Sequence, residues 1–216
     1  MSKVKVPLIA LLVISLALFV SRCDIVDSEI PDDGSDDNGS DDNGSDDDVT
    51  DPSYFEFNKS TNTITGFNED GPSDVPTDVV IPSDIDGVDV KEIGDEAFDL
   101  EDHMTLVEIP DTVTVIGDSA FRSNKLTSVD LGEGVEEIGS TAFQNNSLDS
   151  VEVPNSVKVI EEKAFQHNSL ESVVLGDGVE EIGGFAFGGD NSVTYVEIGE
   201  GVDLNDNEPE TPFDGN

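Results

Sequence analysis

A unit of 22 or 23 residues repeats through the second half of the 216-residue chain. Its copies begin at Ile109, Leu131, Val153 and Leu175. The last of these copies ends just before Ile198. A longer related unit begins at Ile81. One such unit is too short to bury its own apolar side chains, so successive units must stack on one another. The period therefore predicts a solenoid of about five repeats within residues 53–204.

Apolar residues recur at fixed places in each unit. The segment Leu-x-x-Val-x-Leu alternates between apolar and polar residues, which is typical of a β-strand. The segment Val-x-x-Ile-Gly is expected to turn the chain, and Ala-Phe to insert from a short turn or a single helical turn. The phenylalanines should form one continuous buried spine: Phe98, Phe121, Phe143, Phe165 and Phe187. The fold class expected is a mainly β repeat solenoid.

A column of asparagines follows the phenylalanines at the same period: Asn124, Asn146, Asn168 and Asn191. Buried polar side chains in native proteins are almost always hydrogen-bonded. We interpret the column as a ladder that satisfies backbone groups at the turns, which is a structural role and not a binding one.

The motif Ile-Gly-x-x-Ala-Phe, followed by Leu-x-x-Val-x-Ile-Pro, resembles the BspA-like, or treponemal-type, leucine-rich repeat. Residues 116–121 and 138–143 match it directly, and the resemblance extends over about 54–202. Glu161 departs from the pattern at a glycine position. The resemblance implies a leucine-rich-repeat solenoid and a surface-exposed bacterial protein, often adhesive, that binds host, matrix or partner-cell proteins. Fold alone does not fix function.

The amino terminus has the pattern of an export signal. Lys3 and Lys5 precede a 14-residue apolar run, 7–20, which is short for a membrane-spanning helix. The Val20-Ser21-Arg22-Cys23 segment resembles a lipoprotein signal, with Arg22 in place of the usual small residue. We expect residues 1–23 to be a leader with lipidation at Cys23; an uncleaved anchor or a free secreted form are the alternatives. All three export the rest of the chain, and the two anchored forms place it at the cell surface or the outer face of a membrane.

Residues 24–52 repeat Gly-Ser-Asp-Asp-Asn with few apolar residues. They are expected to form a disordered acidic tether. Residues 205–216 are expected to be an acidic tail or a crude C-terminal cap made by Leu204 or Phe213. The stretch before Pro209 resembles the calcium motif between cadherin domains. Its candidate ligands are Asp203, Asn205, Asp206 and Asn207. We prefer a chance match in an Asp- and Asn-rich segment.

The charge balance limits the partners. Nine Lys and Arg stand against 50 Asp and Glu, a formal charge of −41. Phosphate binding needs a cationic face, so nucleic acid is excluded as a partner held by charge. The single Cys excludes a cysteine-based zinc site. His103 and His167 fall at different places in their repeats. We therefore expect no catalysis and no cofactor. The excess of acidic residues leads us to expect a habitat rich in salt or divalent cations, which would screen their repulsion.

The outward-facing residues of the expected strands form the candidate partner-binding face: Leu106, Glu108, Ser128, Asp130, Ser150, Glu152, Ser172, Val174, Tyr195 and Glu197. Leu106 and Tyr195 are the two that resemble interface anchors. The face could be merely solvated, or it could dock a basic or cation-bridged extracellular protein. The sequence thus predicts an adhesin-like binding module, and the alternative is a passive acidic component of the cell envelope.

Overall fold

The structure, a computed structural model, describes residues 49–189, 191–199 and 211–215. All of them belong to one compact unit, Ser45–Asn216. The expected leader with Cys23, the acidic tether and the candidate calcium ligands Asp203, Asn205, Asp206 and Asn207 lie outside the described residues. Within the described ranges, the only helix is the short 3-10 helix η1 (Pro52–Tyr54), so no helix there could cross a membrane.

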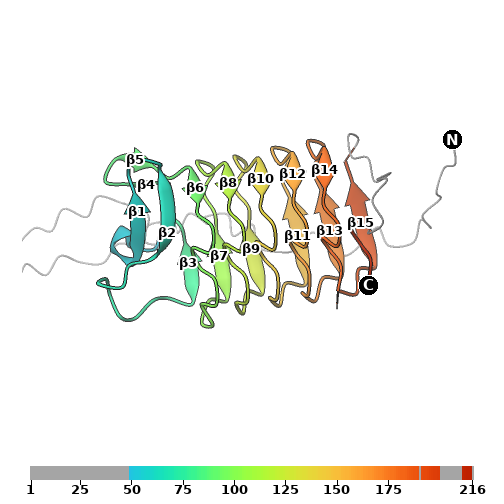
Figure 1. The fold of residues 1–216 in the computed structure, drawn as a ribbon, viewed down its shortest axis with the longest axis horizontal. Helices are drawn as coiled ribbons and strands as arrows, with labels where there is room; N and C mark the ends of the chain where they lie inside the picture. Colours follow the sequence, from blue (N-terminus) through green and yellow to red (C-terminus); the bar gives the residue numbers. More distant parts are fainter. Residues whose placement is uncertain (1–48, 190, 200–210, 216) are drawn as a thin grey trace, which may run out of the picture. The chain divides into compact units, whose positions relative to one another are not determined.

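The described residues wind into a row of coils, and each coil contributes one strand to the face made by the Leu-x-x-Val segments (Figure 1). These strands form two parallel sheets of three. The first consists of β3 (Asp78–Val80), β7 (Leu106–Glu108) and β9 (Ser128–Asp130), and the second of β11 (Ser150–Val153), β13 (Ser172–Leu175) and β15 (Tyr195–Ile198). The expected strands are therefore confirmed. Their register keeps equivalent residues of successive repeats side by side.

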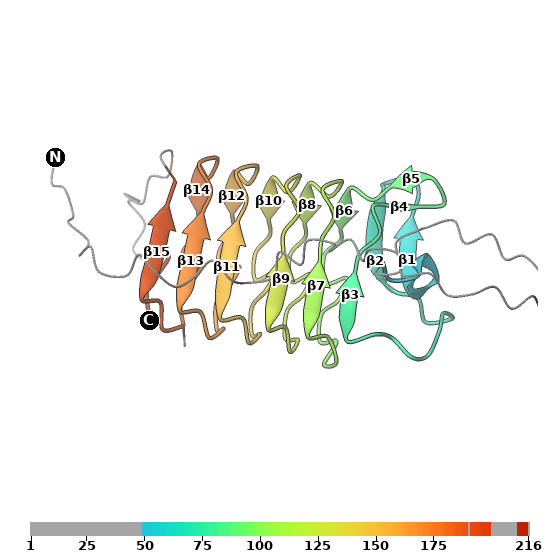
Figure 2. The same cartoon turned by 180° about the vertical axis from the view of Figure 1, so that it is seen from behind.

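A seven-stranded sheet lies along the other side of the coils (Figure 2). Its seven strands are β1 (Phe55–Asn58), β2 (Thr63–Phe67), β6 (Glu92–Ile93), β8 (Val115–Ile116), β10 (Glu137–Ile138), β12 (Val159–Ile160) and β14 (Glu181–Ile182). All neighbours pair in parallel except β1 and β2. The expectation that Val-x-x-Ile only turns the chain was wrong, because two residues per coil are enough to pair once the coils stack. The longer first unit adds a hairpin of β4 (Asp84–Ile85) and β5 (Val88–Asp89).

The expected phenylalanine spine is confirmed. The five rings from Phe98 to Phe187 are fully buried and stacked, with centroids 5.2–5.4 Å apart and interplanar angles of 3–17°. The spacing is close to the roughly 4.8 Å between paired strands, so one ring stacks on the next at each coil, and such aromatic contacts add to the burial of the rings. The spine holds the coils in line.

Each Ala-Phe segment is a turn and not a helical turn. The residues two before and two after each phenylalanine have left-handed backbone conformations, as at Thr141 (φ 57°) and Asn145 (φ 57°). This conformation breaks a helix after one residue and directs backbone groups toward the next coil. The Phe143 N–H thus donates to the Ala164 carbonyl at 2.7 Å.

The asparagine ladder also has the predicted role. Asn168 Nδ2 donates to the Phe143 and Phe165 carbonyls, both at 2.9 Å, and its Oδ1 accepts from the Leu148 N–H at 3.1 Å. Asn146 and Asn191 repeat this arrangement. Each side chain therefore ties adjacent coils together. Asn124 begins the ladder, and its buried Oδ1 has no hydrogen-bond partner among the described residues.

The two ends of the coil stack are closed differently. At the first end, the Thr50 N–H donates to the Val80 carbonyl at 3.1 Å and Thr50 Oγ1 accepts from the Val80 N–H at 2.9 Å, so Thr50 covers the edge of β3. At the last end, the segment 211–215 forms one more turn, in which the Phe187 N–H donates to the Pro212 carbonyl at 2.8 Å. Phe213 adds a further ring to the spine. Leu204 lies outside the described residues.

Candidate interaction face

The ten residues of the candidate face all lie on the strands of the two three-stranded sheets. Pairing places them in two columns. The first column holds Leu106 and Ser128, then Ser150, Ser172 and Tyr195, and the second holds Glu108 and Asp130, then Glu152, Val174 and Glu197. None of the ten is buried, because their neighbours in the strands point into the core. The structure therefore brings the ten together on one face, interrupted where β9 and β11 belong to separate sheets.

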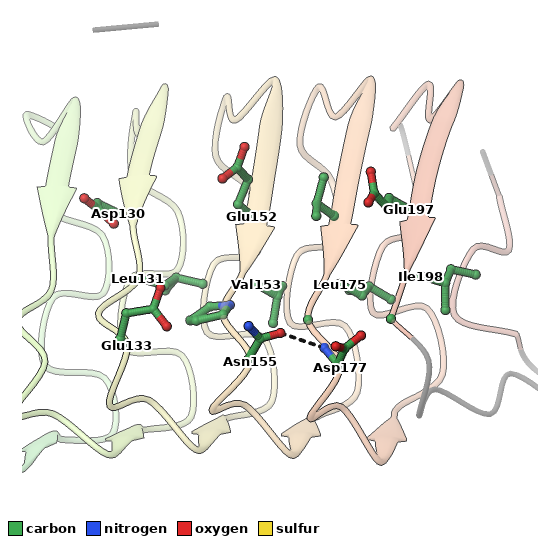
Figure 3. A pocket seen from close by; sticks show the side chains of 14 residues that line it. Asp130, Leu131, Glu133, Glu152, Val153, Asn155, Leu175, Asp177, Glu197 and Ile198 are labelled. Atoms are coloured by element: carbon green, nitrogen blue, oxygen red, sulfur yellow. Dashed lines mark hydrogen bonds between the residues drawn. The ribbon is translucent and has the colours of Figure 1, made fainter. Parts of the chain in front are cut away.

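A groove of about 510 Å³ runs along the second column, from β9 to β15 (Figure 3). Apolar residues at the ends of the strands line it: Leu131, Val153, Leu175 and Ile198. Acidic side chains stand along it: Asp130, Glu133, Glu152, Asp177 and Glu197. Among the described residues, no basic side chain lines the groove. The groove thus offers apolar contact between negative charges.

Side chains of one coil fix the backbone of the next along the groove. Asn155 Oδ1 accepts from the Asp177 N–H at 2.9 Å (Figure 3), and Asp111 Oδ1 accepts from the Glu133 N–H at the same distance, one coil pair earlier. These bonds hold Glu133, Asn155 and Asp177 in a row at a regular spacing along the groove. The row therefore rests on fixed backbone, and it presents an acidic group at every second coil.

Tyr195 is the most exposed residue of the face with an anchor-like side chain, at 51%. Its hydroxyl donates to Glu197 Oε2 at 2.6 Å, and this hydrogen bond to a carboxylate raises the pKa of Tyr195. The bond also holds Glu197 close to the strand. The ring and the carboxylate therefore form one exposed pair on β15.

The groove was not foreseen from the sequence, because its apolar residues read as core positions in the alternating strands. Val153 and Leu175 are indeed almost fully buried, and only their outer surfaces reach the groove. The signal that could have shown it is the small or cyclic residue directly after each strand, such as Pro154 and Gly176, which leaves the strand ends uncovered. Ile198 differs, with 42% of its surface exposed.

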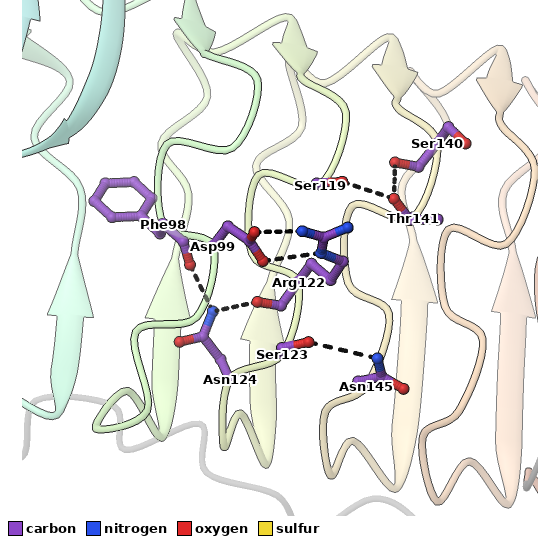
Figure 4. A network of polar contacts seen from close by, with 9 residues as sticks. All are labelled: Phe98, Asp99, Ser119, Arg122, Ser123, Asn124, Ser140, Thr141 and Asn145. Carbon is purple, nitrogen blue, oxygen red and sulfur yellow. Dashed lines mark hydrogen bonds and ion pairs between the residues drawn. The ribbon is translucent and has the colours of Figure 1, made fainter.

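Polar contacts on the turn side of the coils serve the fold. Arg122 makes a two-pronged ion pair with Asp99 (Nε–Oδ1 2.9 Å, Nη2–Oδ2 2.5 Å), and Ser119 bonds to Thr141 across the next step (Figure 4). A bidentate pair of this kind ties two turns together with a fixed geometry. These contacts connect neighbouring coils.

The histidines do not form a joint site. His103 lies near Phe67, with ring centroids 5.8 Å apart, and its Nδ1 is 3.7 Å from Glu101 Oε2. His167 lies on a later turn, where its N–H donates to the Gly188 carbonyl. Among the described residues, no group of three or more His, Cys, Asp or Glu side chains could hold a metal ion.

Parallel coils, a stacked phenylalanine spine and an asparagine ladder define a solenoid of the leucine-rich-repeat class. The model of the BspA type leucine rich repeat region matches residues 91–207 in six copies. The chain belongs to this family. Proteins of the class are generally non-catalytic scaffolds, and membership suggests a protein-interaction module.

Solved structures agree with the assignment. A leucine-rich repeat protein of T. pallidum is 31% identical with a TM-score of 0.60, and the match covers 68% of this chain and 70% of that protein. A leucine-rich repeat protein of Bacteroides ovatus is 29% identical (TM-score 0.58), over 70% of this chain and 41% of the other. One from Eubacterium ventriosum is 28% identical (TM-score 0.53), over 58% and 32%. The chain therefore spans less than half of the latter two. No curated protein matches it.

Proposed function

We propose that the protein is a non-catalytic binding module of the cell surface, adhesin-like, that docks another extracellular protein on the face formed by β7 to β15. The groove is the observation that carries the proposal. It combines an apolar floor with acidic walls, and the described residues that line it include no basic one, which suits a protein surface that presents basic side chains around an apolar centre.

The geometry of the face supports a protein partner over a small molecule. The groove is open along several strands, and equivalent residues of successive coils line it side by side. Small-molecule sites are usually enclosed pockets with a few convergent polar groups. A repeating open face instead suits an extended contact with a macromolecule, as in other solenoids.

The test is binding of the full chain to extracellular proteins and to intact cells, with and without millimolar calcium. Glu152→Lys reverses a charge in the groove on β11. Glu137→Lys makes the same change at an exposed position on β10, in the other sheet, and serves as the matched control. We expect saturable binding that Glu152→Lys weakens at least tenfold and Glu137→Lys leaves within twofold.

No saturable partner in either condition, or equal effects of the two variants, would contradict a docking face. Equal effects would mean that only total charge matters. That result favours the second candidate, a passive acidic envelope component that binds cations weakly. The formal charge of −41 is the observation behind this alternative.

We further propose that the amino-terminal leader anchors the protein at the outer face of a membrane, with a lipid on Cys23 and the acidic segment as a spacer. The apolar run before Cys23 supports an export signal. Metabolic labelling with a fatty acid tests the anchor. Label should enter the protein and be lost in Cys23→Ser; unchanged labelling would place the lipid elsewhere, and no labelling would leave an uncleaved anchor or a secreted form.

A further inference from the structure

Two Asn-x-Ser tripeptides lie in the described part of the chain, and they begin at Asn58 and Asn145. Two more, at Asn38 and Asn43, lie outside the described residues. Asn-x-Ser/Thr is the acceptor sequence for N-linked sugar in exported proteins. The tripeptide also arises by chance, so the surroundings of each asparagine decide whether a transferase can use it.

Asn58 ends β1 and begins the turn to β2, and residues 58–61 are all exposed. Asn58 Oδ1 accepts from the Ser60 N–H at 3.0 Å and from the Ser60 hydroxyl at 2.7 Å. Asn58 Nδ2 makes no hydrogen bond to any described residue. The two bonds therefore hold the side-chain amide through its oxygen. They leave its nitrogen, the atom that receives the sugar, without a competing partner.

Asn145 begins the same tripeptide in a different setting. Its side chain is exposed, but Nδ2 donates to Ser123 Oγ of the preceding coil at 3.4 Å (Figure 4). The middle residue, Asn146, belongs to the asparagine ladder, and the Ser147 N–H donates to the Leu126 carbonyl at 2.8 Å. A transferase would have to separate two coils to bind this tripeptide. The folded chain therefore offers Asn58 and withholds Asn145.

An acidic side chain stands beside Asn58. Burial alternates along β1, with Glu56 and Asn58 both exposed, so their side chains lie on the same face of the strand. The residue two places before Asn145 is Phe143, which is fully buried in the spine. A basic group of a transferase can therefore hold the chain at Glu56 while Asn58 reacts. The fold provides no such contact at Asn145.

We propose that Asn58 is an acceptor for an N-linked glycan, transferred to the folded chain from a lipid-pyrophosphate-linked oligosaccharide. Asn58 Nδ2 forms a bond to the anomeric carbon of the first sugar and loses one proton to a base of the transferase. The bond between that carbon and the pyrophosphate oxygen breaks, and the lipid pyrophosphate leaves with the electron pair. The site requires export of the chain, as proposed above. It lies in the seven-stranded sheet, apart from the docking face.

The full chain purified from its own cells provides the first test. Peptide mapping by mass spectrometry should find a glycan on Asn58 and none on Asn145. Ser60→Ala should lower the occupancy of Asn58 at least tenfold, whereas Ser60→Thr keeps the hydroxyl and should leave the occupancy within twofold. Unmodified Asn58 would overturn the proposal. Equal occupancy of Asn58 and Asn145 would also overturn it, because the sequence and not the fold would then select the site.

Transfer in vitro tests the role of the neighbouring charge. The full chain, made in cells without a transferase, is incubated with a bacterial oligosaccharyltransferase and a lipid-pyrophosphate-linked oligosaccharide. Glu56→Gln should slow transfer to Asn58 at least tenfold. Glu137→Gln makes the same change at an exposed position of the same sheet and should leave the rate within twofold. Equal rates for the two variants would contradict recognition through Glu56.

These results can be separated from those on the proposed function. Fatty-acid labelling at Cys23 reports on the anchor, and the Glu152→Lys variant reports on the docking face. Neither variant changes the turn at Asn58. An anchored, partner-binding protein with unmodified Asn58 would therefore refute the glycan site alone.

Discussion

The ring of Phe213 stacks on the ring of Phe187 with centroids 5.3 Å apart and an interplanar angle of 17°. The spacing equals that within the spine, although Phe213 belongs to a segment that no longer follows the repeat. The flanking backbone continues the pattern too, because the Phe185 N–H donates to the Thr211 carbonyl at 3.1 Å. One side chain near the carboxyl end therefore shields the last fully formed turn.

Phe213→Ala should lower the free energy of unfolding by about 1–2 kcal/mol, because it removes one stacked contact from a partly buried ring. Phe143→Ala, in the middle of the spine, should cost about 3–5 kcal/mol, since it leaves a cavity. Urea unfolding followed by circular dichroism measures both. Equal losses would contradict a capping role for Phe213.

Asn168→Ala should destabilise the protein by about 2–4 kcal/mol, because it leaves the buried Leu148 N–H without its acceptor and removes one of the two amide donors to each of the Phe143 and Phe165 carbonyls. Asn124→Ala is the comparison. Its Oδ1 accepts no bond among the described residues, so the loss should be smaller by at least about 1 kcal/mol. The same urea titration decides, and an Asn124 variant as damaged as the Asn168 variant would argue against the ladder as described.

Glu161 occupies a glycine position of the repeat, and desolvation of its carboxyl together with the charges of Glu181, Glu137 and Asp118 raises the pKa of that carboxyl above its ordinary value of 4.5. A raised pKa means that the folded state favours the neutral acid. Its contribution is favourable below pH 4.5 and is lost as the pH rises through the raised value. Glu161→Gln should therefore increase the melting temperature at pH 7 and have little effect below pH 4.

The control for this prediction is Glu162→Gln, the adjacent acid, which pairs with Lys163. It removes the same charge without relieving the desolvation and charge repulsion at Glu161, so it should change the melting temperature less at pH 7. A Glu161→Gln gain that persists unchanged at pH 3.5 would show that ionisation is not its source.

Salt should stabilise the protein strongly. The described part carries acidic residues on nearly every coil, and five of its basic side chains already pair with acids: Lys59, Lys91, Arg122, Lys158 and Lys163. The Debye length falls from about 10 Å at 0.1 M to about 3 Å at 1 M, which screens the remaining repulsion. Calorimetry in increasing NaCl should show a rising melting temperature. A temperature independent of salt would contradict the expected saline habitat.

Features that recur once per repeat were predictable from the sequence. The roles of Phe143 in the core and of Asn168 in the hydrogen-bond ladder could be predicted because each residue type recurs at the same place in successive units. The burial and the hydrogen bonding then follow from the stacking of the units. Strands of two residues, such as Val159–Ile160, carry no alternation of their own and exist only through their neighbours. The groove escaped prediction for a related reason. Whether Val153 reaches the surface depends on what covers the strand end, and the repeat pattern does not contain that.

The hydrogen bonds between coils connect residues at short and constant separations in the chain. Asn168 reaches 20 residues back to Leu148 and 25 back to Phe143, and the spacing is similar elsewhere in the ladder. Closing a loop of this length costs little entropy, and these contacts do not require residues far apart in the chain to meet. Each new coil can pack on the coil before it, which has already folded. We therefore expect the coils to fold one after another as the chain emerges from a channel such as an export channel. Only the apolar residues of the newest coil would then be exposed to water at any time.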